Sequence, residues 1–386
     1  MTSLRPLPIA AGTAAALALP LLRDAAAGQV ALLPYAADGS PPPVPDGAVP
    51  DAGTALVVGT SGSTGTPKLA MLPAAALAAS ARATHTRLGG PGSWLLAMPP
   101  HHIAGVQVLL RCVAADTEPG LVDLSDGFTA EAFTHAAQAF EGERRYTSLV
   151  PTQLLRVLED PDASRALSEF DAVLVGGAAT SPALLVRARE AGATVVTTYG
   201  MSETCGGCVY DGVPLSPTTI RTDDEGRIHL GGATVASGYL GRPDLTEGAF
   251  VTDGEGVRWF RTDDLGHRDP GSGRWHVDGR LDDVITTGAL KVSPRLVEEA
   301  LTSLPDVAEA VVLGLEDPEW GQIVAAALVV RPGVAHPSVL QVRNALRGSL
   351  ADHALPRRIV VLGELPLRGP GKPDRAGIAA LFHTRP

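Results

Sequence analysis

The chain has 386 residues, of which 45% are hydrophobic and 19% charged, so its composition is globular and allows more than one domain. Its formal net charge of −11 excludes the basic surface that nucleic-acid binders carry, and we expect no nucleic-acid partner. Three cysteines are too few for a disulfide framework and indicate a reducing compartment. No uninterrupted apolar run reaches roughly 18 residues, the length of a membrane span, so we expect no stable membrane insertion.

The amino-terminal segment has features of both a signal peptide and an ordinary helix. Arg5 precedes an Ala/Leu-rich stretch that runs to Leu22, and three alanines follow at 25–27, as in a signal peptide. However, prolines and a glycine interrupt this stretch, and residues 13–27 also fit an Ala/Leu-rich helix. We therefore expect a helix over residues 13–27.

From residue 54 to about residue 198, β-rich runs alternate with helical stretches. Strands are expected at 55–59, 93–98, 145–150, 172–175 and 194–198, and helices at 74–87, 153–159 and 182–191. This alternation predicts a largely parallel sheet with helices on its faces. Ligands in such sheets bind at the carboxyl ends of the strands, so we expect the functional residues there.

The pattern changes twice in the second half of the chain. Short strands at 227–232, 257–262 and 274–277 predict a β-rich subdomain, and the elements beyond Asp282 predict a compact α+β unit. Those last elements are helices at 294–304 and 337–350 and strands at 310–314, 323–330 and 358–362. The predicted fold is therefore α/β. It has a large domain over residues 1–281, with mainly parallel sheets and flanking helices, and a small mobile domain over residues 282–386.

The clearest motif reads TSGSTGTPK and follows the predicted strand at 55–59. Its hydroxyl groups, glycines and lysine can surround a polyphosphate, because glycine lets the backbone approach while N–H and hydroxyl groups donate hydrogen bonds. The residues concerned are Thr60, Ser61, Gly62, Ser63, Thr64, Gly65 and Lys68. Pro67 precedes the lysine and Leu69 follows it, which differs from the Walker loop and disfavours a P-loop ATPase. We expect this loop to connect a buried strand to a helix.

Two further motifs suit other parts of a nucleotide. In TYGMSET, Tyr199 could stack on a purine and Glu203 could bind the Mg²⁺ that accompanies ATP. In WFRTDDLG, Asp264 is expected on a turn, where its carboxylate could grip both hydroxyls of a ribose. Near the carboxyl end, Lys372 lies between a glycine and a proline and could be presented as a point charge.

Together with GRLDDVI at 279–285, the order and spacing of these motifs resemble the adenylate-forming superfamily of acyl-CoA synthetases, luciferases and adenylation domains. The resemblance covers residues 54–375 and implies an enzyme that uses ATP, Mg²⁺, a carboxylic acid and CoA. It implies that the loop Thr60–Lys68 binds the β- and γ-phosphates, that Tyr199 contacts the adenine, and that Glu203 and Thr64 bind Mg²⁺. It further implies that Asp264 binds the ribose and that Arg280 contacts the nucleotide. Asp282 would be the hinge and Lys372 the adenylation lysine. A chain that uses ATP belongs in the cytoplasm.

Three segments, at 89–105, 144–154 and 198–215, resemble the o-succinylbenzoate–CoA ligases of actinobacterial menaquinone biosynthesis. This narrower resemblance places His102 beside the acyl group as a catalytic residue. It also places Gly176, Gly177 and Ala178 in the loop that lines the acyl pocket. The second carboxylate of that acid needs a polar partner, for which Ser202, Thr204 and Arg144 are candidates. The sequence departs from many relatives at 287–289 and at Lys291.

Other interpretations stay open at this point. The chain could be another aryl- or acyl-CoA ligase, or a stand-alone adenylation enzyme that loads a carrier protein. Cys205 and Cys208 form a CxxC pattern that could support redox chemistry or half of a zinc site, although no second cysteine pair exists. His101 and His102 lack a third metal ligand at recognisable spacing. The sequence leaves the oligomeric state open, with a homodimer among the possibilities.

Overall fold

The computed structural model describes residues 3–60, 68–367 and 373–384. The chain packs into two compact units. Unit 1 contains residues 1–180, 187–221 and 229–262, and unit 2 contains residues 181–186, 222–228 and 263–386. The chain finally passes into unit 2 at Asp263, earlier than the domain boundary predicted at Asp282, and the hinge at Asp282 stays a prediction.

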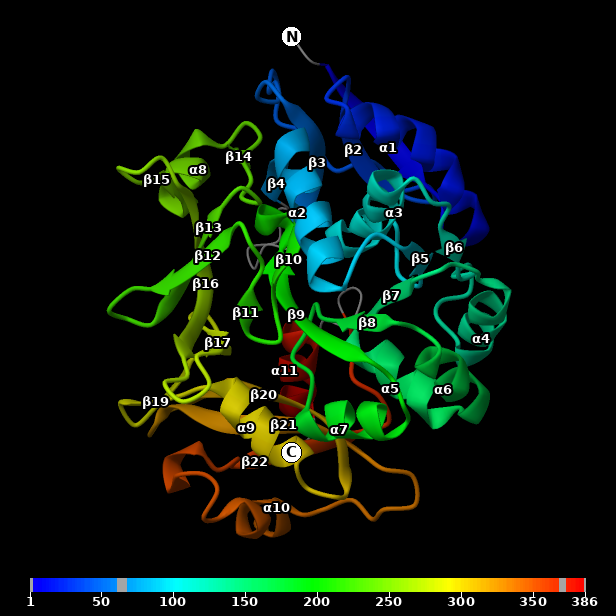
Figure 1. The fold of residues 1–386 in the computed structure, drawn as a ribbon. Helices are drawn as coiled ribbons and strands as arrows, with labels where there is room; N and C mark the ends of the chain where they lie inside the picture. The colour runs from blue at the N-terminus through cyan, green and yellow to red at the C-terminus, as the bar shows by residue number, and fades with distance from the viewer. Residues whose placement is uncertain (1–2, 61–67, 368–372, 385–386) are drawn as a thin grey trace. The chain divides into compact units, whose positions relative to one another are not determined.

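Two sheets lie wholly within unit 1 (Figure 1). The first contains, in spatial order, β1 (Leu4–Ile9), β2 (Ala31–Ala36), β3 (Thr54–Thr60), β4 (Lys68–Pro73) and β14 (Gly238–Tyr239). The second contains β11 (Val213–Pro214), β10 (Gly206–Tyr210), β9 (Val195–Met201), β8 (Ala172–Val175), β7 (Arg145–Leu149), β5 (Ser93–Leu96) and β6 (Gly120–Leu121). Strands β9, β8, β7, β5 and β6 run parallel, so their carboxyl ends share one edge.

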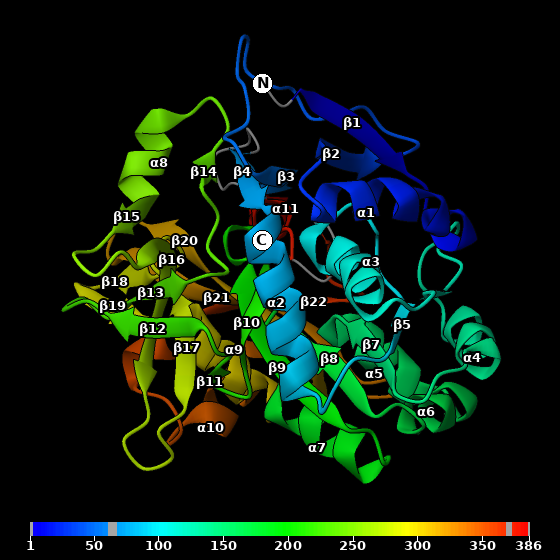
Figure 2. The ribbon, with the colours of Figure 1, turned by 45° about the horizontal axis from the view of Figure 1, so that its top comes forward.

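Three helices lie between these two sheets, as Figure 2 shows. They are α1 (Leu19–Ala26), α2 (Ala74–Arg87) and α3 (Ile103–Ala115). Helix α2 packs against β3 and β4 of the first sheet and against β10 of the second, while α3 packs against β5, β7 and β10. The main core of the unit joins apolar residues of all three helices to both sheets. Burial of this apolar surface is the main stabilising contribution.

Further helices follow along the chain. Helices α4 (Ala130–Ala139), α5 (Pro151–Glu159) and α6 (Pro161–Ser168) contact one another, and α7 (Pro182–Glu190) and α8 (Pro243–Ala249) follow later in the chain. Proline stands in the first turn of α5, α6 and α8, where its missing N–H would have no partner in the helix anyway.

A third sheet contains residues of both units. It has the order β12 (Thr218–Thr222), β13 (Arg227–Gly232), β16 (Arg258–Arg268) and β15 (Phe250–Thr252), and β17 (Trp275–Arg280) also pairs with β16. The fourth sheet has the order β19 (Leu290–Val292), β18 (Ile285–Thr287), β21 (Gly321–Val330) and β20 (Val307–Asp317), and β22 (Arg358–Leu362) also pairs with β21. Helices α9 (Pro294–Thr302), α10 (Val339–Leu346) and α11 (Arg375–Thr384) complete unit 2. Two apolar clusters form its core.

The sequence predicted the fold class correctly and several elements to the residue: strands 172–175, 227–232 and 358–362 and the helix at 74–87. The expected helix at 13–27 is instead a 3-10 helix (Gly12–Ala18) followed by α1. Proline in the first turn of α1 explains this division, because proline favours a helix start and disfavours a helix interior. Strands β1 and β2 were not predicted.

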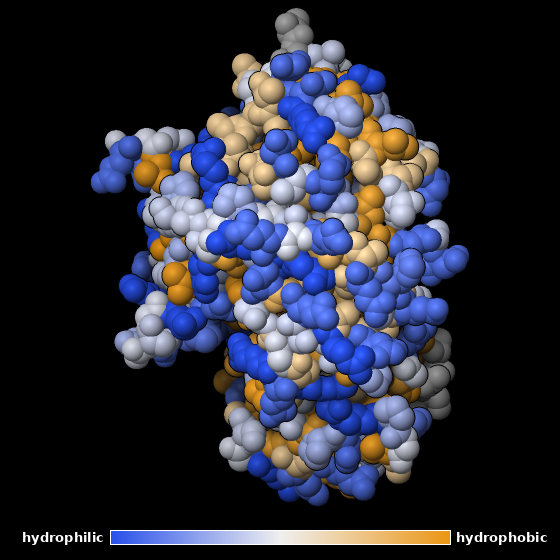
Figure 3. Space-filling model, turned by 45° about the vertical axis from the view of Figure 1, so that its right-hand side comes forward, coloured by the Kyte–Doolittle hydropathy of each residue, from blue (hydrophilic) through white to orange (hydrophobic). Residues whose placement is uncertain are grey.

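Among the described residues, no helix combines the length and the apolar character that a membrane crossing requires. On the face in view in Figure 3, hydrophilic and hydrophobic residues are interspersed.

Candidate active site

The carboxyl edge of the second sheet collects the residues predicted to meet the acid and the adenine. His102 lies in the connection between β5 and α3, at the N-cap of α3, and is exposed. Gly176 follows β8 directly, and Tyr199 lies half-buried near the end of β9. Because β5, β8 and β9 all run in the same direction, the fold brings these three positions to one edge, as predicted. Their roles in binding and catalysis stay predictions.

Two glycines at this edge are required by close backbone approach. A Cβ at Gly105 would lie 2.1 Å from the carbonyl oxygen of Pro99, in the turn that carries His102. A Cβ at Gly176 would lie 2.1 Å from the Thr198 hydroxyl. Any side chain at either position would displace its neighbour, so these glycines fix the shape of the loops.

Glu203 lies on a short 3-10 turn, Ser202–Thr204, between β9 and β10, and its side chain is buried. Its Oε1 accepts a hydrogen bond of 2.8 Å from the Tyr239 hydroxyl, and its backbone carbonyl accepts one of 2.8 Å from the Ala236 N–H. A buried polar group without a hydrogen-bond partner is costly, so these bonds stabilise the buried side chain. Sequence analysis did not find Tyr239, because a tyrosine 36 residues from its partner gives no local signal.

Lys68 lies close to the same tyrosine, with its Nζ 5.4 Å from the centroid of the Tyr239 ring. Thr60 and Lys68 pair across β3 and β4, so the two ends of the TSGSTGTPK segment are adjacent. The segment therefore joins two antiparallel strands, and the expected connection from a strand to a helix was wrong. Lys68 itself extends β4, and the helix begins only at Ala74. Ser61, Gly62, Ser63, Thr64 and Gly65 lie outside the described residues.

The described part of unit 1 fits a magnesium ion carried by a nucleotide. Mg²⁺ is usually held by one or two carboxylates together with substrate phosphates rather than by a cage of protein ligands. Glu203 supplies a buried carboxylate of that kind, oriented by Tyr239. No group of three or more His, Cys, Asp or Glu side chains among the described residues could hold a metal alone, so phosphate oxygens would have to complete the coordination.

Arg280, in unit 2, is surrounded by carboxylates. Its Nε and Nη2 donate to both oxygens of Asp282 at 2.8 and 2.9 Å, and Nη1 lies 3.5 Å from Asp264. These partners raise the pKa of Arg280. Burial alone would raise the pKa of Asp282, but the hydrogen bonds and charge of Arg280 outweigh it and hold that pKa below its usual value. The residues predicted for ribose, nucleotide and hinge are therefore in direct contact.

Asp264 does not lie on a turn, and that expectation was wrong. It lies within β16, directly opposite Arg280 of β17. Burial alternates along this part of the strand, with Thr262 and Asp264 buried and Asp263 between them exposed. A cross-strand pair of opposite charges stabilises the ladder and overrides the local preference of an Asp-Asp sequence for turns.

Lys372 lies outside the described residues, but the chain on either side of it is anchored in unit 2. Leu367 and Pro373 form a bridge, and the Asp374 N–H donates to the Pro366 carbonyl at 2.8 Å. The guanidinium of Arg375 lies 3.0 Å from Glu298 and 3.4 Å from Asp283.

The three residues predicted to bind the second carboxylate of the acid lie in two different places. Ser202 and Thr204 are buried on the Glu203 turn, and the Thr204 hydroxyl accepts from the Met201 N–H and lies 2.9 Å from the Gly206 carbonyl. Arg144 directly precedes β7 and therefore lies at the amino edge of the sheet, whereas Gly176 follows β8 at the carboxyl edge. Five strand residues separate the edges by roughly 16 Å. The prediction for Arg144 was wrong.

The alternative centred on the cysteines finds no support in the geometry. Cys205 and Cys208 are free and buried. Burial raises the pKa of Cys208 to about 12 and also raises the pKa of Cys205. Redox cysteines need an accessible thiol of lowered pKa, so this pair is suited to packing.

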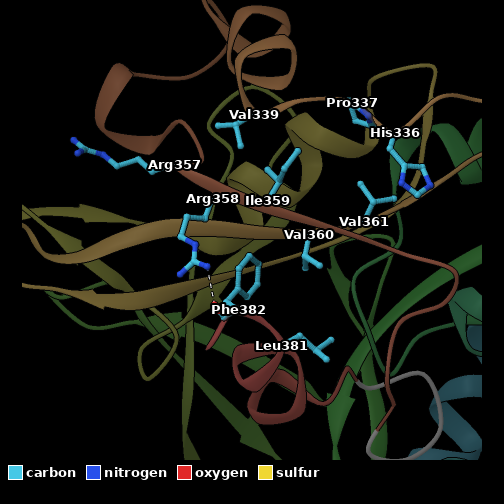
Figure 4. A pocket seen from close by; sticks show the side chains of 10 residues that line it. All are labelled: His336, Pro337, Val339, Arg357, Arg358, Ile359, Val360, Val361, Leu381 and Phe382. Atoms are coloured by element: carbon cyan, nitrogen blue, oxygen red, sulfur yellow. Dashed lines mark hydrogen bonds between the residues drawn. The ribbon is translucent and has the colours of Figure 1, made fainter. Parts of the chain in front are cut away.

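Unit 2 contains a pocket of about 470 Å³ that includes none of the predicted site residues. Figure 4 shows Arg358 of β22 pointing toward Phe382 of α11, whose backbone carbonyl accepts its hydrogen bond at 2.7 Å. The lining residues are His336, Pro337, Val339, Arg357, Arg358, Ile359, Val360, Val361, Leu381 and Phe382.

Two family models match the chain. The model of the AMP-binding enzyme matches residues 15–240, and that of the AMP-binding enzyme C-terminal domain matches residues 296–372. Among curated proteins, a probable 2-succinylbenzoate–CoA ligase of Mycobacterium tuberculosis is 46% identical over 383 residues, which are 98% of each chain. A 2-succinylbenzoate–CoA ligase of Enterococcus faecalis is 30% identical over 82% of this chain and 67% of its own length. A sulfoacetate–CoA ligase of Cupriavidus necator is 32% identical over 88% of this chain and 68% of its own.

Solved structures agree with these matches. The o-succinylbenzoate CoA synthetase of Bacillus subtilis, in complex with the acyl-adenylate intermediate OSB-AMP, has a TM-score of 0.72 and 27% identity. The similarity covers 93% of this chain and 80% of that one. The amide bond synthetase McbA of Marinactinospora thermotolerans has a TM-score of 0.77 and 26% identity, covering 99% and 90%. The chain therefore belongs to the family of AMP-binding enzymes.

Proposed function

We propose that the chain is an ATP-dependent 2-succinylbenzoate–CoA ligase that acts in the cytoplasm, in menaquinone biosynthesis. The observation that carries this proposal is the 46% identity to a probable enzyme of that activity over 98% of both chains. The Glu203–Tyr239 pair in unit 1 and the Arg280–Asp264–Asp282 cluster in unit 2 supply groups that suit a nucleotide. The homodimer stays a prediction, to be measured by light scattering of the purified enzyme.

The first step makes an activated acid. A carboxylate is a poor acyl donor, because its leaving group would be oxide. One carboxylate oxygen attacks the α-phosphorus of ATP, the bond from that phosphorus to the bridging oxygen of the β-phosphate breaks, and pyrophosphate leaves. The product is an acyl-adenylate, in which AMP is a good leaving group.

Catalysis of this step consists mainly of positioning the reactants and compensating the charge on the phosphate oxygens. In this proposal Lys372 compensates the charge at the reacting phosphate, and the Thr60–Lys68 segment binds the outer phosphates. Tyr199 contacts the adenine, and Asp264 and Arg280 bind the ribose and its phosphate. A bound Mg²⁺ would neutralise phosphate charge, with Glu203 and Thr64 as the residues to hold it.

The second step transfers the acyl group to CoA. The thiol sulfur attacks the acyl carbonyl carbon, the bond to the phosphate oxygen of AMP breaks, and the thiol proton passes to solvent or a nearby base. Gly176, Gly177 and Ala178 are assigned to the acyl pocket, and His102 to the reacting carbonyl. If Lys372 occupies the approach of the thiol during the first step, a rotation at Asp282 would clear it.

Acid-dependent exchange of pyrophosphate into ATP tests this function. The acids compared are 2-succinylbenzoate, benzoate, sulfoacetate, fatty acids and amino acids, each with Mg²⁺, and CoA is then added to detect the thioester. We expect exchange with 2-succinylbenzoate and thioester formation with CoA. Exchange with another acid would keep the mechanism and overturn the substrate.

The same assay separates the alternative activity. A stand-alone adenylation enzyme would support exchange but would transfer the acyl group to a carrier protein and not to CoA. Absence of exchange with every acid, from folded protein, would contradict the proposed function.

A further inference from the structure

A buried polar stripe runs between helices α2 and α3, whose facing surfaces are otherwise mostly apolar. Ser80 and Thr84 are four residues apart on α2, and Gln107 and Arg111 are four residues apart on α3, so each pair lies on one face of its helix. All four side chains are buried. None of them was assigned a role from the sequence.

The first half of the stripe binds a single backbone atom. The Gln107 Nε2 donates to the carbonyl oxygen of Cys205 at 2.6 Å, and the Ser80 hydroxyl donates to the same oxygen at 3.0 Å. Cys205 is the residue that directly follows the Glu203 turn. Two buried donors from two different helices therefore fix the end of that turn.

The residue that they bind has a strained backbone. Cys205 has a φ of 54°, in the left-handed region where a residue with a Cβ is disfavoured. Such strain persists only where the surroundings hold the backbone firmly, and it is concentrated at functional sites. The two donors, together with the hydrogen bond from the Cys205 N–H to the Ser202 carbonyl, hold this conformation.

The turn is also held on the side of Glu203. The Ala236 N–H donates to the Glu203 carbonyl, and the Tyr239 hydroxyl donates to its carboxylate. Tyr239 therefore orients the carboxylate, while Gln107 and Ser80 fix the backbone that carries it.

The second half of the stripe, formed by Thr84 and Arg111, includes a buried charge whose polar contacts are incomplete. Arg111 lies over the Trp94 ring, 4.6 Å from its centroid, and its Nη2 lies 3.4 Å from the Tyr210 hydroxyl, which also contacts Thr84 at 3.0 Å. Among the described residues, Arg111 has no carboxylate partner, and the Gln107 Oε1 and Arg111 Nε have no hydrogen-bond partner. Buried polar groups without partners cost stability, so packing alone does not account for them.

We infer that Gln107, supported by Ser80, is a positioning residue that fixes the turn at Cys205 and so presents the Glu203 carboxylate to the Mg²⁺ of the bound nucleotide. This inference rests on the proposed function, because it assigns Glu203 to the metal. Gln107 acts only through the backbone of the turn. In metal sites, loss of an outer partner of this kind lowers metal affinity about 10- to 100-fold.

The test compares Gln107→Met, which keeps the size and removes both polar groups, with Gln153→Met. Gln153 is the control: it is also buried, its Nε2 donates to the carbonyl of Ala97 at 2.7 Å, its Oε1 accepts from the Val150 N–H at 3.0 Å, and neither partner belongs to the Glu203 turn. The first readout is the rise in melting temperature that ATP produces with Mg²⁺ relative to ATP with EDTA. The second is the Mg²⁺ concentration for half-maximal ATP–pyrophosphate exchange.

For Gln107→Met we expect the Mg²⁺-dependent part of the temperature rise to fall and the half-maximal Mg²⁺ concentration to increase about tenfold. We expect Gln153→Met to change neither, even if it lowers the melting temperature. In a Glu203→Gln background, Gln107→Met should have no further effect on the Mg²⁺ response, because its target is gone. If Gln107→Met fails to fold, Ser80→Ala replaces it, with a smaller change in the same direction.

Two results would overturn the inference while the proposed function stands. One is an active wild type in which Gln107→Met lowers the melting temperature but leaves the Mg²⁺ response unchanged. The other is an equal change in Gln153→Met. A wild type that shows neither exchange nor a Mg²⁺-dependent temperature rise would overturn the proposed function, and the inference with it.

Discussion

At the scale of single residues, the hydrogen bond from the Tyr239 hydroxyl to the Glu203 carboxylate supports the proposed metal site in unit 1. A buried hydrogen bond to a charged group contributes about 1.5–3 kcal/mol. The bond also selects one orientation of the carboxylate, which the proposed metal site requires.

Replacement of Tyr239 tests this orientation. Tyr239→Phe removes only the hydroxyl, and we expect the rate of ATP–pyrophosphate exchange to fall by roughly 10- to 100-fold. Tyr146→Phe is the control, because the Tyr146 hydroxyl donates to the Leu88 and Gly90 carbonyls at 3.0 and 3.1 Å, beside the amino-terminal part of β7. An equal loss of exchange in both variants would indicate general destabilisation instead.

His85 gives a prediction about pH. Burial, and secondarily the positive charge of Arg111, lower its pKa from 6.5 to about 4. The unfolded chain therefore takes up a proton at His85 near pH 6.5 while the folded chain does not, so stability falls as the pH decreases from about 6.5 toward 4.

We expect wild-type protein to lose about 1–2 kcal/mol of unfolding free energy from this group between pH 7 and pH 5. The measurement is urea denaturation at both pH values, compared with His85→Gln, which can still accept the hydrogen bond from Trp94 but does not titrate. Equal pH dependence of the two proteins would contradict the assigned pKa.

At the scale of elements, the hairpin of β18 and β19 carries a local conflict between sequence and structure. Its two connecting residues, Gly288 and Ala289, have φ values of 54° and 65°, which suits glycine and disfavours alanine. Ala289 therefore holds a backbone conformation that a residue with a Cβ rarely adopts.

The prediction is that Ala289→Gly stabilises unit 2. Relief of the left-handed alanine, less the added freedom of the unfolded chain, gives about 0.5–1 kcal/mol. Gly288→Ala should do the opposite, because its Cβ would also lie 2.9 Å from the Trp320 ring. Urea denaturation followed by tryptophan fluorescence measures both variants, and a loss of stability in Ala289→Gly would refute the argument.

At the scale of the whole molecule, the proposed reaction needs groups from both units. Glu203 and Tyr199 belong to unit 1, whereas Asp264, Arg280 and Lys372 belong to unit 2. We expect substitutions in unit 2 to affect adenylate formation and thioester formation separately.

Lys372→Ala should abolish formation of the adenylate, because the charge at the reacting phosphate is no longer compensated. Attack of CoA on adenylate that was prepared beforehand should be spared. Both half-reactions are followed by chromatography of the adenylate and the thioester. An equal loss of both would remove the assignment of Lys372.

Asp282→Pro should give the reverse pattern. Proline fixes φ near −65° and restricts the residue before it, so rotation at this point is impeded while adenylate formation continues. We expect thioester formation to fall at least about tenfold. Asp282→Ala is the control, because it removes the carboxylate from Arg280 without restricting the backbone, and an identical effect of both variants would argue against a hinge.

The sequence by itself determined several elements and the order of the motifs along the chain. Strand 172–175 and the helix at 74–87 have local hydrophobic patterns strong enough to fix their bounds. Parallel strands then bring His102, Gly176 and Tyr199 to one edge, because the direction of each strand follows from the alternation with helices.

Only the tertiary structure decided which side chains meet. Asp264 belongs to a strand because Arg280 pairs with it across the ladder, and Arg144 is remote from the acyl loop because it precedes its strand. Tyr239 reaches Glu203 from 36 residues away, and Gln107 reaches Cys205 from 98 residues away. Such contacts leave no local pattern in the chain, since they arise when separate elements pack and their buried polar groups must find partners.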